Sequence, residues 1–392
     1  MKQFLTFLLL LAFCWRAEAQ TMYWTNSAGG DYYTAGNWTN DTASAIQFGA
    51  SNSVSFSPIL NNTYQVDFSA SATNNFFNFV PLAASVNTLK LNIGAGNTFM
   101  VSNGFPMNQI YAYATNRLHV SGGIMLAVTN VESIWCYNQS LTEFVLTNGC
   151  THLGGNSPLS LTSISGGKGT CVMSIYDSTN IAQRAALATV TSSPNYSTNI
   201  LNLFSGLFQI TNAPGANSSI LLLGGAAGSW NFLNVYGGTC VASNAVSGIT
   251  NCQNYIYQTG GTIGFSFLNS GGAGTNTQNN IAISGGTCYA TNSFFSTNAT
   301  TTSTITLSNG TFYTENLVAG GDTTSLCILN ILDGATFTCT NSTGTGTFNW
   351  GSAGTATGTV SCANFNVDNA YVTNSASNLI IKRNMNCKTL RL

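Results

Sequence analysis

The chain has 392 residues, of which only 5% are charged, against roughly a quarter in ordinary globular proteins, and its net charge is −1. This near-neutral balance excludes the basic surface that nucleic acids and anionic membranes attract, so we expect no nucleic-acid partner. Because 44% of the residues are hydrophobic, the composition also excludes a disordered chain.

Residues 1–19 have the features of a signal peptide. Lys2 supplies a positive end, an apolar run follows from Phe4 to Phe13, and Ala17-Glu18-Ala19 is a small-x-small cleavage site. We therefore expect export to the extracellular space or the cell surface. No later apolar run approaches the ~18 residues that a membrane helix needs, so we expect no integral membrane span after cleavage.

Residues 20–60 are expected to form an N-terminal β cap. Trp24 and Trp38 lie on either side of a glycine-rich turn, and the alternating stretch from Ser53 to Ser57 predicts a strand. The two tryptophans have two interpretations. They cover the open end of the repeat region that follows, which we favour, or they form a platform on which sugars stack.

Residues 61–392 are expected to form one repeat domain. The stretch Ile281–Asn292, I-A-I-S-G-G-T-C-Y-A-T-N, recurs at Leu233–Asn244, Ile256–Ile263, Ile305–Asn316 and Asn330–Asn341, and more weakly at Ala356–Asn364. The second small residue of each copy falls at Gly238, Gly261, Gly286, Gly310, Ala335 and Gly358, with spacings of 23, 25, 24, 25 and 23 residues. Repeats of about 24 residues predict a solenoid.

Each copy alternates apolar and polar residues, which predicts strands and an all-β parallel β-helix. We expect the glycines Gly238, Gly261, Gly286, Gly310 and Gly358 to form structural turns. The residues two positions later, Cys240, Ile263, Cys288, Phe312, Phe337 and Val360, are all apolar and are expected to point inward. Six positions after the glycine stand Asn244, Asn292, Asn316, Asn341 and Asn364, which predict an internal asparagine ladder from coil to coil.

The motifs resemble a known repeat family. The W…GG…GNW opening, followed by T-Y-Q-V-D-F-S-A (63–70), N-T-L-K-L-N-I-G-A-G-N-T-F-M-V-S-N (87–103) and the later G-G-T-x-x-x-T-N copies, is similar to exported proteins with autotransporter-associated β-strand repeats. These proteins are common in Verrucomicrobia-like bacteria. The resemblance covers nearly the whole mature chain and implies a pectin-lyase-like, right-handed β-helix that is secreted or displayed at the surface.

The ionisable residues are too scattered to predict a catalytic site. Glu315 and Asp333 come closest to a carboxylate pair on neighbouring coils, which a glycosidase needs. His119 lies beside Arg117 on an alternating strand, and Cys150 and His152 supply only two potential ligands where a zinc site needs four. We therefore predict no catalytic residue, no metal and no cofactor.

The leading hypothesis is a non-enzymatic, secreted or cell-surface β-helical protein of structural or adhesin-like type, with glycans or other surface components as partners. The alternative is a polysaccharide-binding or polysaccharide-cleaving β-helix with a site in the irregular region 132–212. A third hypothesis, prompted by Thr336, Thr338 and Thr340, is binding to ice or crystal faces.

Overall fold

The computed structural model describes residues 19–42, 45–56, 62–79, 85–108, 113–128, 132–136, 139–154, 158–163, 169–187, 197–211, 220–223, 228–247, 251–270, 276–296, 298–319, 326–331, 335–351, 359–372 and 378–391. The expected signal peptide, except Ala19, lies outside these residues, as do Gly358 and Asp333. Strands predominate among these residues, and the one helical element in them is the 3-10 turn Ala35–Asn37.

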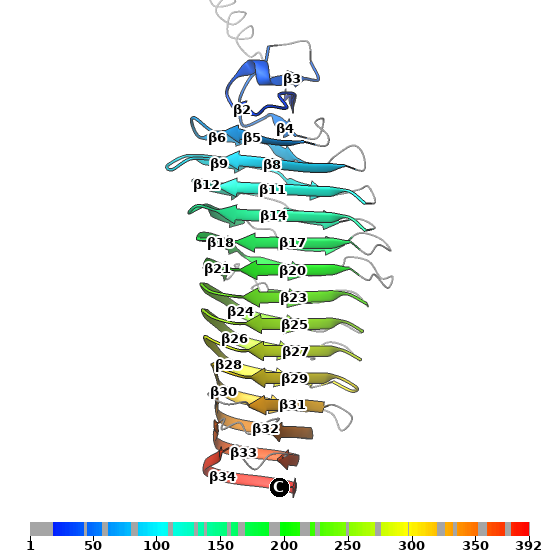
Figure 1. Cartoon of the computed structure of the whole chain (residues 1–392), viewed down its shortest axis with the longest axis vertical. Coiled ribbons are helices and arrows are strands. Elements are labelled where there is room, and N and C mark those ends of the chain that lie inside the picture. Colours follow the sequence, from blue (N-terminus) through cyan, green and yellow to red (C-terminus); the bar gives the residue numbers. More distant parts are fainter. Residues whose placement is uncertain are drawn as a thin grey trace, which may run out of the picture.

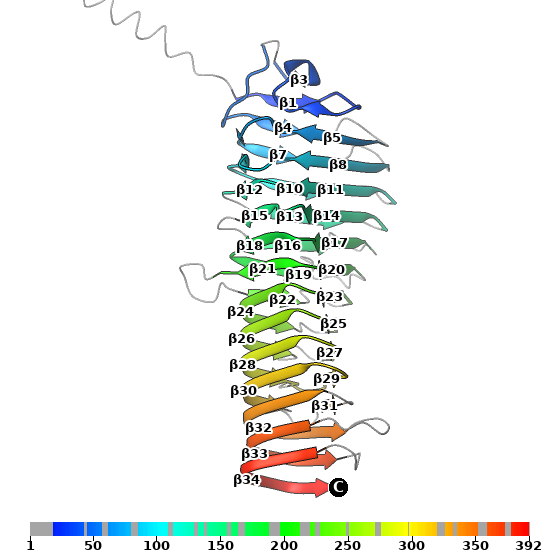
Figure 2. The ribbon, with the colours of Figure 1, turned by 60° about the vertical axis from the view of Figure 1, so that its left-hand side comes forward.

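The chain winds into a β-solenoid whose coils stack into a rod, with the first strands at one end and the last strand at the other (Figures 1 and 2). The pairings between coils in the described residues are parallel, which confirms the predicted parallel β-solenoid. A coil averages roughly 26 residues, slightly more than the 24 predicted. Coils near the middle are longer, since Ile200 pairs with Phe232, whereas Phe232 pairs with Tyr255 only 23 residues later.

Three strips of strands form the faces of the rod. The first face holds β5 (Thr63–Asp67), β8 (Val86–Asn92), β11 (Thr115–Ser121), β14 (Leu141–Thr147), β17 (Thr170–Ile175), β20 (Thr198–Leu203), β23 (Trp230–Val235), β25 (Gln253–Gln258), β27 (Gln278–Ile283), β29 (Thr302–Leu307) and β31 (Leu326–Ile331). The second face begins with β6 (Ala72–Asn74), β9 (Thr98–Val101), β12 (Ile124–Ala127), β15 (Thr151–Gly154), β18 (Ser178–Ala182) and β21 (Gly206–Ile210). The third begins with β10 (Phe105–Asn108), β13 (Glu132–Cys136), β16 (Pro158–Ser163), β19 (Arg184–Leu187) and β22 (Ile220–Leu223).

From β24 onward the second and third faces are made by single bent strands. The first half of β24 pairs with β21 and its second half with β22. These bent strands are β24 (Thr239–Ser247), β26 (Thr262–Ser270), β28 (Thr287–Phe295) and β30 (Thr311–Ala319), followed by the longer β32 (Thr336–Gly351), β33 (Thr359–Val372) and β34 (Asn378–Arg391). One residue at each bend has no partner in the register, for example Ser266 between Phe265 and Phe267.

The N-terminal segment closes one end of the rod with aromatic side chains. It contains β1 (Thr21–Trp24), β2 (Gly30–Asp31), the 3-10 turn η1 (Ala35–Asn37), β3 (Trp38–Asn40), β4 (Ser53–Ser55) and β7 (Phe76–Asn78). Trp24 and Trp38 are buried and meet edge to face, with ring centroids 4.9 Å apart. Their indole N–H groups donate to the carbonyls of Asn26 and Tyr32. Both rings therefore cover the core, and neither offers a free face to a sugar.

The expected apolar column lies in the core wherever its side chains are described. Cys240, Ile263, Cys288, Phe312 and Phe337 occupy one register column and are at most 1% exposed. Burial raises the pKa of Cys240 to about 12, and the pKa of Cys288 is also raised. These thiols therefore stay protonated and act as small apolar side chains.

A second column inside the rod is polar, and the sequence analysis missed it. The second residues of β20, β23, β25 and β27 are Asn199, Asn231, Asn254 and Asn279, all at most 2% exposed. Each amide donates to the next: Asn199 to Asn231 at 2.9 Å, Asn231 to Asn254 at 3.0 Å and Asn254 to Asn279 at 2.9 Å. Buried amides are tolerated because neighbouring coils satisfy them.

Replacement of Asn254 by alanine should lower the free energy of unfolding by about 2–4 kcal/mol, because Asn231 loses an acceptor and Asn279 loses a donor inside the core. Asn292→Ala is the matched control, since Asn292 is partly exposed and its amide oxygen accepts one bond, from Asn316. It should cost below about 1 kcal/mol. Denaturant unfolding monitored by circular dichroism compares the two, and equal losses would contradict a special role for the buried column.

Candidate functional site

The predicted turn glycines stand at the corner between the first and second faces. Gly238, Gly261 and Gly286 have φ values of 71°, 66° and 76°, in the left-handed region that favours glycine. At each of them a Cβ would collide with the glycine carbonyl of the preceding coil. Gly310 differs, because its φ is not in this region and a Cβ there would first meet the Ile283 side chain at 2.7 Å.

The predicted asparagine column is in register, but its three members with described side chains lie partly at the surface rather than inside. Asn292 pairs with Asn316, Asn316 with Asn341, and Asn341 with Asn364, while Phe267 stands between Asn244 and Asn292. Asn316 donates to Asn292 at 2.9 Å. The side chains of Asn244, Asn292 and Asn316 are partly exposed, because they follow the bend where the strand passes from the second to the third face. The internal ladder is the Asn199–Asn279 column instead.

One group of ionisable residues lies on the first face, in and near the irregular region. Arg117 and Glu143 pair in register, and the Arg117 Nε donates to the Glu143 carboxylate at 3.0 Å. His119 lies beside Lys90 in the register, and burial lowers the pKa of His119, with Glu143 acting in the opposite direction. The register brings a single carboxylate into this group, where hydrolysis of a glycosidic bond needs two.

Neither Cys150 nor His152 is placed for metal binding. Both are fully buried, burial raises the pKa of Cys150 to about 12, and the His152 ring is 2.6 Å from the Asn180 amide. Glu315 lies exposed at a bend. In the part of the chain that the structure describes, no three His, Cys, Asp or Glu residues gather where they could hold a metal ion.

Aromatic rings on the first face, and directly after its strands, are partly or largely exposed and pack against one another along the rod. Tyr176, Phe204 and Tyr236 stack with centroids 4.4 and 4.7 Å apart, and Phe232 stacks on Tyr255 at 4.7 Å. These separations match the ~4.8 Å distance between neighbouring strands, so each ring covers the face of the next. The stacks therefore present mainly ring edges to solvent and are poor platforms for a flat ligand.

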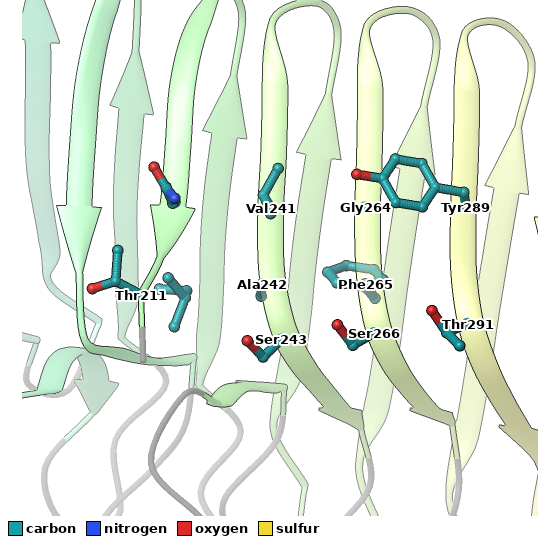
Figure 3. A pocket seen from close by; sticks show the side chains of 11 residues that line it. Thr211, Val241, Ala242, Ser243, Gly264, Phe265, Ser266, Tyr289 and Thr291 are labelled. Carbon is teal, nitrogen blue, oxygen red and sulfur yellow. The ribbon is translucent and has the colours of Figure 1, made fainter. Parts of the chain in front are cut away.

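Tyr289 on the second face is arranged differently. In its register column stand Gln209, Val241, Gly264 and Tyr289, on four successive coils. The Tyr289 ring extends over the strand that carries Gly264 and fills the space that a side chain would take there (Figure 3). Tyr289 is 43% exposed, and no ring of the described residues packs against it. Its ring can therefore meet a ligand.

A groove of about 330 Å³ runs past this ring. A row of hydroxyl groups, one per coil, lines it beside Tyr289: Thr211, Ser243, Ser266 and Thr291 (Figure 3). The remaining lining residues are Gln209, Ile210, Val241, Ala242, Gly264 and Phe265. We call this surface the Tyr289 groove. An aromatic ring beside fixed hydroxyl and amide groups is suited to a polyhydroxylated ligand, whose apolar face stacks while its hydroxyls form hydrogen bonds.

The lining of the Tyr289 groove is almost free of ionisable side chains. Apart from the tyrosine hydroxyl, its lining carries no ionisable side chain. The sequence analysis did not find this groove, although one signal was present. Gly264 is the only glycine at its position in the aligned copies, where Val241, Tyr289, Tyr313, Thr338 and Ser361 stand in the others.

Comparison with known proteins identifies no relative: no family model, no curated protein and no solved structure matches the chain. Among the described residues, no helix is both long enough and apolar enough to cross a membrane.

Replacement of Gly261 by alanine should destabilise the rod by more than about 1–2 kcal/mol, the cost of left-handed backbone alone, because the Cβ also strikes the Gly238 carbonyl. Gly310→Ala is the comparison and should cost less, because the Gly310 backbone is not left-handed and its Cβ would first meet the Ile283 side chain rather than a carbonyl. Alanine already stands at the next equivalent position, Ala335. A comparison of thermal unfolding tests this, and equal destabilisation at both positions would contradict the assignment.

Proposed function

We propose that this protein is an exported, non-catalytic β-solenoid of adhesin-like type that binds glycans through the Tyr289 groove. The observation that carries the proposal is the exposed Tyr289 ring over Gly264, next to a row of hydroxyl groups. The absence of ionisable groups other than Tyr289 from the groove lining favours binding over bond cleavage. The export signal expected at residues 1–19 supports a ligand outside the cell.

Replacement of Tyr289 by alanine should weaken glycan binding by about 0.5–1.5 kcal/mol, which is roughly two- to tenfold in Kd. The matched control is Tyr257→Ala, since Tyr257 is exposed to a similar degree, 37%, but lies on the first face. A glycan array followed by isothermal titration calorimetry with the best ligand measures both. Unchanged binding by the Tyr289 variant, or an equal loss in the control, would contradict the proposal.

Gly264→Ala provides a second arm of the same experiment. A Cβ at this position would strike the tip of the Tyr289 ring, which is a movable side chain at the surface, so the ring should be displaced while the fold persists. We expect weaker glycan binding with an unfolding midpoint close to that of the unchanged protein. Full affinity in this variant would show that the position of the ring does not matter.

The alternative function is cleavage of a polysaccharide on the first face, where Arg117 and His119 lie near the single carboxylate of Glu143. In that case Glu143→Gln should abolish the release of reducing sugars from one member of a panel of neutral and acidic polysaccharides. Arg117→Gln, which removes the partner of Glu143 but keeps the carboxylate, should retain part of the activity. Under the proposal above, the unchanged protein releases no sugar from any of them.

A further inference from the structure

The direction of the Tyr289 groove along the rod indicates what kind of glycan it accepts. Its lining comes from β21, β24, β26 and β28, which are consecutive parallel strands of the second face. Four strands span three separations of ~4.8 Å, so the groove extends about 14 Å along the axis of the rod. This length exceeds one sugar ring and suits a chain of several sugars.

The hydroxyl row repeats along the same direction. Thr211, Ser243, Ser266 and Thr291 stand on successive coils, and Ser266 and Thr291 are exposed (Figure 3). The Thr211 hydroxyl already donates to the Ala182 carbonyl at 3.5 Å. The exposed hydroxyls of Ser266 and Thr291 can donate and accept hydrogen bonds, so these two coils offer the same chemistry to successive units of a ligand. A polymer with regularly repeated hydroxyl groups gains contacts with each added unit, whereas a single sugar contacts only part of the row.

Charge at the end of the row selects against acidic ligands. Glu315 occupies on β30 the bend position that Thr291 occupies on β28, since the paired residues flank both of them. Glu315 is exposed, and the groove lining itself contains no cation that could balance a uronate or sulfate group. An anionic chain that follows the hydroxyl row would therefore meet like charge at its end.

We infer that the Tyr289 groove binds a neutral polysaccharide chain that lies along the axis of the solenoid, an inference that rests on the proposed glycan-binding function. Tyr289 supports one sugar ring by stacking, the hydroxyl row bonds to neighbouring units, and Glu315 disfavours acidic chains.

Calorimetric titration with neutral β-linked gluco-, xylo- and manno-oligosaccharides of one to six units tests the length dependence. We expect Kd for the best series to fall at least tenfold between one and four units. Ser266→Ala should weaken binding of the tetramer about fivefold, the loss of roughly one hydrogen bond, while leaving the monomer less affected. Thr306→Ala, on the first face, is the control and should leave every Kd unchanged.

Oligogalacturonate of equal length tests the charge preference at low salt. It should bind at least fivefold more weakly than the neutral tetramer, and Glu315→Gln should narrow this difference. Tighter binding of the acidic chain, or a Kd independent of chain length, overturns the inference while the proposed function stands, provided that Tyr289→Ala still weakens binding. No measurable binding of any saccharide by the folded protein overturns both.

Discussion

Strict register between neighbouring coils is the constraint on which the whole structure depends. Each coil must present its backbone N–H and C=O groups to the coils on both sides, because unpaired groups inside the rod would cost free energy. The corner illustrates this demand, since the Thr262 N–H donates to the Gly238 carbonyl and the Thr287 N–H to the Gly261 carbonyl. Because the glycines at this corner adopt a left-handed backbone and have no Cβ, neighbouring coils come close enough for these hydrogen bonds. A displaced coil would break both the corner and the ladder of buried amides.

The same constraint arranges side chains into columns whose properties follow from their direction. Inward columns must be apolar or must satisfy their own hydrogen bonds, and the Asn199–Asn279 column does the latter. Outward columns with rings on successive coils stack, because the strand spacing places the rings face to face at 4.4 and 4.7 Å between centroids. Aromatic rings repeated on successive coils therefore cover one another's faces, which are the surfaces that a ligand would use. A binding site on such a rod requires an interruption of a column.

Much of this architecture could be predicted from the sequence, since the recurrence from Gly238 to Ala335 fixes coil length, corner position and the apolar column. The internal ladder was harder to find because its asparagines follow loops of different length, so Asn199 and Asn231 are 32 residues apart but Asn231 and Asn254 only 23. The groove could not be predicted from one copy alone. It arises because the long side chain of Tyr289 lies over Gly264 on the preceding coil, and Gly264 has no side chain there.

This origin explains why the groove is a better candidate than the polar or charged positions that stand out in the sequence. Arg117 and Glu143 already satisfy one another, and His152 is enclosed in the core. Tyr313, next in register to Tyr289, has another tyrosine on the coil before it. Only Tyr289 in this column has a glycine on the coil before it and hydroxyl groups alongside. A ring supported by backbone needs no aromatic partner, so the stacking energy that the other columns use within the rod is left for a ligand.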